Sequence, residues 1–256
     1  MTTPLHTHTP NPVLAPIMSV ARALHQHAYG RVALIIAACM LPFSLARLAL
    51  YLIYREDFQG IGFIEVLSAF VVGLRFDLSV AIIGIFLPLL MMLLPFRWSH
   101  HIYWQRFWGW LIYVVLMLLA LMLAADTIYF GVVHRHVGSE IGAMSSDIAP
   151  MLALAFGQYG FILLLFAAGA AFGALLWRRL VHPVPAAPQR AWPRLLGIVA
   201  ILLLFVVIGR GGWTGKPISV GDAFFSNSVA QGYLSLNCAF AVTHALNENA
   251  PLLRDF

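Results

Sequence analysis

Charged residues are scarce in this chain. Only 10% of its 256 residues are charged, and 61% are hydrophobic, whereas a soluble globular domain carries about 25% charged residues. This composition excludes an ordinary soluble domain and places the chain in a lipid bilayer. Cysteine is scarce too, with Cys39 and Cys238 alone. Cys39 lies in an apolar run, so we do not expect a disulfide framework.

Motifs for catalysis are also missing. The sequence contains no GxSxG, GxxxxGK[ST], HExxH or CxxC motif, and no Ser/His/Asp or paired-carboxylate constellation. Basic residues do not cluster with aromatic ones, so we expect no nucleic-acid partner. His134, Arg135 and His136 are consecutive, but no Cys, Asp or Glu stands beside them at metal-ligand spacing. We therefore expect solvent or lipid phosphate at this triplet, and no metal.

Apolar runs dominate what is present. A helix needs about 20 apolar residues to cross the hydrocarbon core. Five runs reach or approach that length, at residues 32–54, 78–96, 107–125, 161–177 and 195–209. The sequence therefore predicts an all-α, polytopic membrane protein with five transmembrane helices. An apolar stretch at 61–73 precedes the second run, and one helix from Gly62 to Phe96 would be about 52 Å long. Part of it would have to project from the bilayer, tilt or lie flat.

Small residues mark the fourth run. Gly169 and Gly173 are four positions apart, a spacing that lets two helix backbones approach closely. The same spacing arises by chance in Ala-rich and Gly-rich spans, so both interpretations stay open.

Basic and acidic residues are sorted along the chain. Residues 1–31, 97–106 and 178–194 hold eight of the 15 basic residues and none of the ten acidic ones. The positive-inside rule predicts a cytoplasmic N-terminus and an outside C-terminus. We expect a polar cytoplasmic tail at 1–30, a five-helix transmembrane domain at 31–210 and an extracytoplasmic segment at 211–256.

The last segment has a helical pattern of its own. One helical face would carry Phe225, Val229, Tyr233, Leu236 and Phe240. Ser219 followed by Asp222 resembles a capping box. We predict an amphipathic helix on the outer membrane surface or against the outer ends of the bundle. A helix of a folded outer domain would fit the same pattern.

Ionisable residues at membrane depth are the candidate functional residues, because burying them in lipid is costly. Arg75 and Asp77 stand two positions apart and cannot face each other on a helix. Each needs another partner, which is either a lipid headgroup or, for Asp77, a structural pair with Arg47. Asp126 ends the third run and either binds a basic partner or caps the next turn, and we expect a loop from Asp126 to about Ala153 between the third and fourth runs.

Two further cations, Arg210 and Lys216, bracket the turn RGGWTGKP. This turn either holds a lipid phosphate or is a flexible exit from the bilayer. The predicted lipid-binding set is Arg75, Asp77, Asp126, Arg135, Arg210 and Lys216.

Several short motifs come in the order of a known family. GLRFDLS starts the second span, ADTIYF closes the third, and RGG…P…N…LN follows the fifth. With the five-span plan, these resemble the membrane domain of lipoteichoic-acid-synthase-like proteins. Those proteins are phosphoglycerol and phosphoethanolamine transferases of the alkaline-phosphatase/sulfatase superfamily. The resemblance covers roughly residues 32–250, and each motif is individually short.

The resemblance implies a large extracytoplasmic α/β catalytic domain, with a threonine nucleophile and a divalent metal. Nothing in these 256 residues matches that threonine or its metal ligands. We expect a fragment, or a protein that keeps only the membrane half, in the cytoplasmic (inner) membrane of a bacterium. The outer helix would then dock the catalytic domain onto the bundle. The implied partners are that domain and phosphatidylglycerol or phosphatidylethanolamine.

The leading hypothesis is an anchoring domain that positions the lipid donor and is inactive alone. A small transporter or channel is the second, motivated by Arg47, Arg75 and Asp77 within the spans. A non-catalytic assembly subunit is the third, using the small residues of the fourth run to bind a partner.

Overall fold

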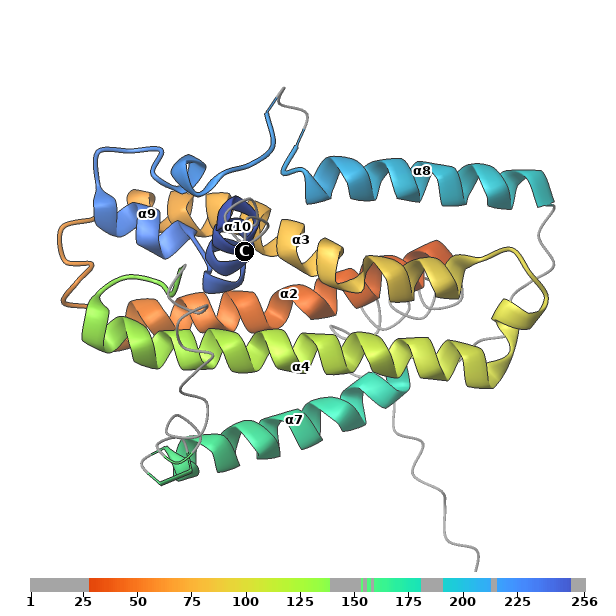
Figure 1. Ribbon diagram of the computed structural model, residues 1–256, viewed down its shortest axis with the longest axis horizontal. Helices are drawn as coiled ribbons and strands as arrows, with labels where there is room; N and C mark the ends of the chain where they lie inside the picture. The colour runs from red at the N-terminus through yellow and green to blue at the C-terminus, as the bar shows by residue number, and fades with distance from the viewer. Residues whose placement is uncertain are drawn as a thin grey trace, which may run out of the picture.

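The computed structural model describes residues 28–138, 153, 156–157, 159–180, 191–212 and 216–249. Every element in these ranges is helical, as the sequence predicts (Figure 1). The long helices are α2 (Ala28–Ile53), α3 (Phe63–Leu93), α4 (Ile102–Val133), α7 (Gly160–Leu180) and α8 (Ala191–Gly209). Short ones are η1 (Trp98–His100), η3 (Val220–Ala223), α9 (Val229–Ser235) and α10 (Cys238–Asn249).

Four of the long helices are long and apolar enough to cross a membrane. They are Gly30–Ile53, Phe63–Leu93, Ile102–Val133 and Gly160–Leu180. The apolar part of α8 is shorter, Leu195–Gly209. The fold is therefore that of a helical membrane protein, in which the fifth predicted run forms a shorter helix.

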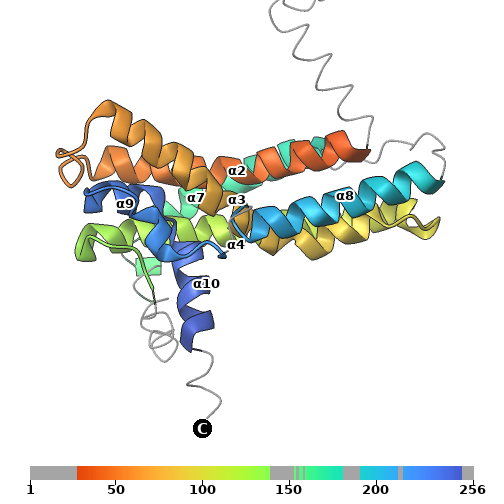
Figure 2. The ribbon, with the colours of Figure 1, turned by 90° about the horizontal axis from the view of Figure 1, so that it is seen from above.

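The core of the bundle is made by α2, α3 and α4, which run side by side (Figures 1 and 2). Phe43, Phe76, Ile85, Leu89 and Ile112 are almost completely buried between them. α8 lies along the part of α3 nearer its C-terminal end, whereas α9 lies along its N-terminal part (Figure 1). The end of α8 therefore meets the middle of α3.

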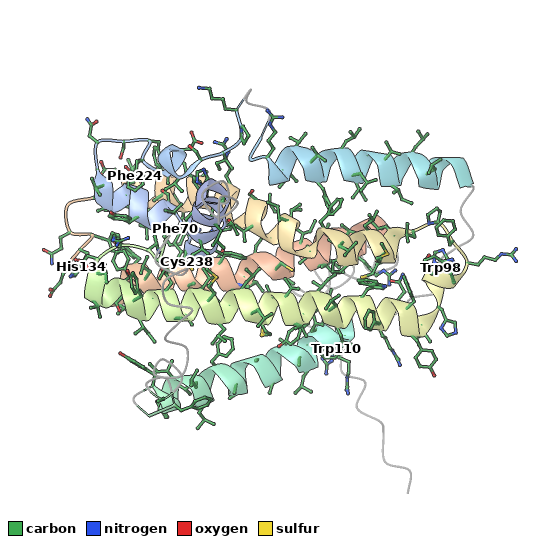
Figure 3. All side chains as sticks on the ribbon, in the orientation of Figure 1. Phe70, Trp98, Trp110, His134, Phe224 and Cys238 are labelled. Atoms are coloured by element: carbon green, nitrogen blue, oxygen red, sulfur yellow. The ribbon has the colours of Figure 1, made fainter. Side chains whose placement is uncertain are left out.

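The two ends of the bundle differ in chemistry, and Trp98 and His134 mark them (Figure 3). At the Trp98 end, indole rings cluster, with Trp98 and Trp104 centroids 4.5 Å apart and Trp104 and Trp108 centroids 5.5 Å apart. Arg97 and Arg106 lie in the same segment. We call this the tryptophan end, and the opposite end the His134 end.

The largest extensions beyond the predicted bounds are those of α3 and α4. α3 has 31 residues, or about 46 Å at 1.5 Å per residue, because it continues upstream to Phe63 and the side chain of Glu65 caps its first turn. The N–H of Gly62 donates to Glu65 Oε2 at 2.6 Å. α4 continues to Val133, so the prediction of a loop starting at Asp126 was wrong. The rest of that predicted loop, 139–152, lies outside the described residues.

The fourth predicted run, α7, contacts both α4 and α2. A Cβ atom at Gly173 would lie 3.0 Å from the hydroxyl oxygen of Tyr113, whereas one at Gly169 would meet nothing within 4 Å. Trp177 Nε1 donates to the carbonyl of Gly109 at 2.9 Å. Gly173 therefore admits the side chain of Tyr113, whereas nothing packs against Gly169, and the predicted close approach of two helix backbones stays a prediction.

The predicted single amphipathic helix after residue 211 was wrong. The chain forms η3, α9 and α10, and it breaks at Leu236 and Asn237 because Asn237 starts a new helix. The N–H of Phe240 donates to Asn237 Oδ1 at 2.7 Å, an N-cap bond. The predicted Ser219–Asp222 cap is present at η3, with Ser219 N donating to Asp222 Oδ2 at 2.7 Å.

The C-terminal segment that contains η3, α9 and α10 is called the tail from here on, and its buried and exposed faces also differ from the prediction. Gln231 and Ser235, which do not belong to the predicted apolar face, are buried, whereas Phe225 and Val229, which do, are exposed. The reason is that Gln231 bonds to α3: its Nε2 donates to the carbonyl of Glu65 at 3.0 Å and to Ser68 Oγ at 2.6 Å. α10 points sideways, away from the bundle axis (Figure 2).

Candidate functional site

Among the described residues, a dense group of buried hydrogen bonds lies where α9 meets α2, α3 and α4. Its first component is a bidentate ion pair between Arg47 of α2 and Asp77 of α3. Nη1 lies 2.6 Å from Oδ2 and Nη2 lies 2.8 Å from Oδ1, with side chains only 4% and 0% exposed. This parallel geometry is the strong form of an arginine–carboxylate contact. The structural pairing considered from the sequence is therefore confirmed.

Arg47 has donors left over, and they reach the tail. Its Nε donates to the carbonyl of Leu234 at 2.8 Å, and its Nη2 donates to that of Ser235 at 3.2 Å. The guanidinium lies flat against Gly73, where a Cβ atom would be only 2.3 Å from Arg47 Cζ. A glycine at 73 is therefore what lets the guanidinium occupy this position.

The second component is a pair between Asp126 of α4 and His136. Asp126 Oδ2 lies 2.6 Å from His136 Nδ1, and Oδ1 accepts from the N–H of Val137 at 2.9 Å. His136 Nε2 lies 2.8 Å from the carbonyl of Tyr233. The expectation of solvent or lipid phosphate at His136 was wrong, because both side chains of this pair are only 5% exposed.

The chain reverses direction at His134, which explains the pair. His134 ends α4 with a φ of 56°, in the left-handed region that is uncommon for residues other than glycine. The reversal brings His136 back onto the last turns of α4. His134 itself is exposed, with its Nδ1 3.1 Å from Asp57 Oδ1. A helical spacing rule cannot find a partner ten residues away, and this is why the sequence did not indicate Asp126 with His136.

Together the two pairs satisfy the C-terminal end of α9. The last four carbonyls of a helix have no partner within it. Here the carbonyl of Gly232 accepts from Leu236 N at 3.0 Å, and those of Tyr233, Leu234 and Ser235 accept from His136 and Arg47. Cationic groups are also favoured at this end of the helix dipole.

Asn237 connects the same site to α10. Its Nδ2 donates to Asp77 Oδ1 at 2.8 Å, while its Oδ1 caps α10. Asn237 belongs to the LN pair that carried the family resemblance, yet it was not a predicted site residue. We call the two ion pairs, the carbonyls of Tyr233, Leu234 and Ser235, and Asn237 the outer joint, after the side of the membrane on which the sequence predicts it.

A cavity of about 20 Å³ lies between the two ion pairs. Polar side chains line it from several elements, among them Arg47, Asp126, His136 and Asn237, together with Cys238. A cavity this size with several polar partners is large enough for one water molecule. Of the three charges that suggested a transporter, Arg47 and Asp77 are thus paired with each other, next to a space for a single water.

A different arrangement surrounds the end of α8, where the RGG stretch forms a Schellman motif. The N–H of Gly211 donates to the carbonyl of Ile208 at 2.8 Å, and that of Gly212 donates to Val207 at 2.9 Å. Gly211 has a φ of 84° and Gly212 one of 130°. The two glycines therefore end the helix, a role that the sequence interpretation did not consider.

α3 receives this turn with two side chains. Ser79 Oγ donates to the carbonyl of Gly209 at 2.7 Å, and Arg75 Nε donates to that of Gly211. Arg75 thereby has the separate partner that its spacing from Asp77 required. Its side chain is exposed beside the end of α8.

The six predicted lipid-binding residues fall in three places. Asp77 and Asp126 are buried in the outer joint, where protein groups occupy both carboxylates. Arg75 and Arg210 lie at the end of α8, with Lys216 a few residues further along the chain, and all three are exposed. Arg135 is exposed beyond the end of α4. Lipid contact by these residues stays a prediction.

Within the described ranges, no three His, Cys, Asp or Glu side chains are grouped so that they could hold a metal ion. Comparison with protein-family models, with curated proteins and with solved structures finds no match to this chain.

Proposed function

We propose that this chain is the membrane domain of a phospholipid-headgroup transferase of the bacterial cell envelope. It anchors the enzyme, positions a phosphatidylglycerol or phosphatidylethanolamine donor, and acts with an extracytoplasmic, metal-dependent catalytic domain. The observation that carries the proposal is the outer joint, which fastens the tail to the bundle through buried charges. A tail fixed in this way suits a domain that holds a catalytic partner at a defined height above the lipid.

The proposed placement has five spans, with the tryptophan end inside and the His134 end outside. Arg97 and Arg106 at the tryptophan end, and Glu56, Asp57 and Glu65 near the His134 end, agree with the positive-inside rule. Tryptophan rings are typical of the membrane interface. The hydrocarbon core is about 30 Å thick, so α3, a helix of 31 residues whose C-terminal end lies near the tryptophan end, projects beyond it with its N-terminal end.

The end of α8 supplies the proposed donor site. Arg75, Arg210 and Lys216 are exposed there, and no acidic residue lies between Arg210 and Lys216 in the chain. α8 is the shortest of the long helices, so its end is level with the proposed outer lipid surface. Cations at that level attract lipid phosphate, at about 1 kcal/mol for each Lys or Arg near the surface.

Lipid retention tests the donor site. The purified chain is exchanged into nanodiscs containing phosphatidylglycerol, and the lipid it keeps on transfer to detergent is measured by native mass spectrometry. A triple variant, Arg75→Gln, Arg210→Gln and Lys216→Gln, is expected to lose about 3 kcal/mol, or about a hundredfold in affinity. Arg55→Gln is the matched control, since Arg55 is an exposed arginine near the His134 end. Equal retention by the triple variant and the control contradicts the proposal.

Activity gives a second test. The chain alone is expected to release neither glycerol phosphate nor phosphoethanolamine from labelled lipid. Turnover that a point mutation within the chain abolishes would show that these residues catalyse the reaction themselves, contrary to the proposal.

A further inference from the structure

The ion pair of His136 and Asp126 differs from that of Arg47 and Asp77 because an imidazole has a neutral form, whereas a guanidinium in a protein does not deprotonate. Both ring nitrogens of His136 face oxygen atoms, with Nδ1 2.6 Å from Asp126 Oδ2 and Nε2 2.8 Å from the Tyr233 carbonyl. A carbonyl oxygen can only accept a hydrogen bond, so Nε2 carries a proton. The contact of Nδ1 with the carboxylate requires a second proton, held by one or the other.

With two protons the pair is neutral overall, either as imidazolium and carboxylate or as imidazole and carboxylic acid. Removing one proton leaves a buried negative charge, and one of the two hydrogen bonds is lost. Both consequences are unfavourable in a site whose side chains are 5% exposed.

The neighbouring groups do not compensate for this charge. Arg47 of α2 faces the pair across the cavity, but it is already paired with Asp77 of α3. α9 contributes the carbonyl of Tyr233, and α10 contributes Cys238. Burial, and then the neighbouring Asp126 carboxylate, raise the pKa of the Cys238 thiol above its ordinary value. The thiol therefore stays neutral.

We propose that docking of α9 on the end of α4 depends on the second of the two protons that the His136–Asp126 pair holds. The proton is bound while α9 is docked, and its loss on alkalinisation loosens α9 and the start of α10. The Arg47–Asp77 pair does not lose its charge on alkalinisation, because arginine does not deprotonate in proteins. This proposal concerns local opening of the tail and does not rest on the headgroup-transferase function.

The direction of the pH effect follows from proton counting. A histidine free of partners binds its second proton only below about pH 6.5. Below that pH the released and docked states hold the same number of protons, so docking is independent of pH. Above it the released state holds one proton fewer, and docking weakens by up to tenfold per pH unit.

The reactivity of the Cys238 thiol reports whether the outer joint is open, since Cys238 is fully buried there (Figure 3). The background is Cys39→Ala, so that Cys238 is the one thiol. The rate at which the full chain reacts with a maleimide is measured between about pH 5.5 and about pH 8.5. It is measured once with the chain folded in mild detergent and once with the chain denatured. The ratio of denatured to folded rates is a protection factor, from which the reactivity of the thiolate itself cancels. Protection is expected to be constant below about pH 6.5 and to fall above it, by up to tenfold per unit.

Asp126→Asn is the decisive variant, because an amide can donate to Nδ1 and accept from Val137 without a titrating proton. It is expected to show no loss of protection as pH rises. His134→Gln changes the neighbouring exposed histidine and is expected to keep the wild-type profile. A flat wild-type profile overturns the proposal, and so does an Asp126→Asn profile that falls as steeply as the wild type. If Asp126→Asn does not fold, His136→Gln replaces it and is judged in the same way.

Discussion

At the scale of single residues, the outer joint depends on what each buried charge is allowed to contact. Asp77 holds the guanidinium of Arg47 through both carboxylate oxygens, and Arg47 then has donors for Leu234 and Ser235. A buried ion pair is weak support for stability by itself, because desolvation offsets its attraction. Its value here is geometric, since it fixes the direction in which Arg47 presents its remaining donors to α9.

Replacing Asp77 tests that view. Asp77→Asn leaves Arg47 charged and buried without a counter-ion, which is expected to destabilise the fold by about 3 kcal/mol and lower the melting temperature by about 10 °C. Thermal unfolding in detergent measures it. Glu56→Gln, which changes an exposed carboxylate, is expected to shift the melting temperature by no more than about 1 °C. Equal melting of the two variants contradicts the importance of the pair.

Two glycines give a matched comparison at the same scale. Gly73→Ala places a methyl group on the guanidinium of Arg47, so the pair must move or the helices must separate, with an expected loss of about 2 kcal/mol. Gly169→Ala meets nothing within 4 Å and is expected to change stability by less than about 0.5 kcal/mol. Thermal unfolding compares the two. The account fails here if the alanine at 169 is as harmful as the one at 73.

At the scale of elements, helix ends carry most of the specific structure. α8 ends in a Schellman motif, and α3 binds its last carbonyls through Ser79 and Arg75. Gly211→Ala puts a side chain on a residue with a φ of 84° and brings its Cβ within 2.4 Å of Ile218. We expect a loss of about 2 kcal/mol in unfolding free energy.

The control for that change is Gly60→Ala, where a Cβ would meet nothing within 4 Å. It is expected to lower stability little, within about 0.5 kcal/mol. Chemical denaturation of both proteins gives the comparison, and a Gly211→Ala variant as stable as Gly60→Ala would contradict the capping role.

The sequence predicted which segments are helical better than where they end. Apolar content located the five long helices, because a run of about 20 apolar residues is a strong signal. It allowed a helix that begins near Gly62, as α3 does, but it did not reveal that α4 continues past Asp126, since a partner of that extension, the Tyr54 hydroxyl that donates to the carbonyl of Thr127, is distant in the sequence. The break between α9 and α10 was missed for the same reason: Asn237 caps α10 while bonding to Asp77.

At the scale of the whole molecule, about half of the outer joint could be predicted. Arg47 and Asp77 stood out because ionisable residues within apolar runs need partners. His136 did not, because it reaches Asp126 only after the chain reverses at His134. The pattern predicted that the tail buries its apolar face, yet Gln231 and Ser235, which lie outside that face, are buried. Their partners lie in α3 and α2, which no local pattern connects to the tail.

The central claim is that the tail and the bundle form one unit through the outer joint. Hydrogen–deuterium exchange of the chain in nanodiscs, followed by mass spectrometry, tests it most directly. The account predicts that amides of residues 229–242 exchange as slowly as those of α3 in the wild type, and much faster in Asp77→Asn, while α8 is unchanged. Fast exchange of 229–242 in the wild type, or the same slow exchange in Asp77→Asn, would contradict it.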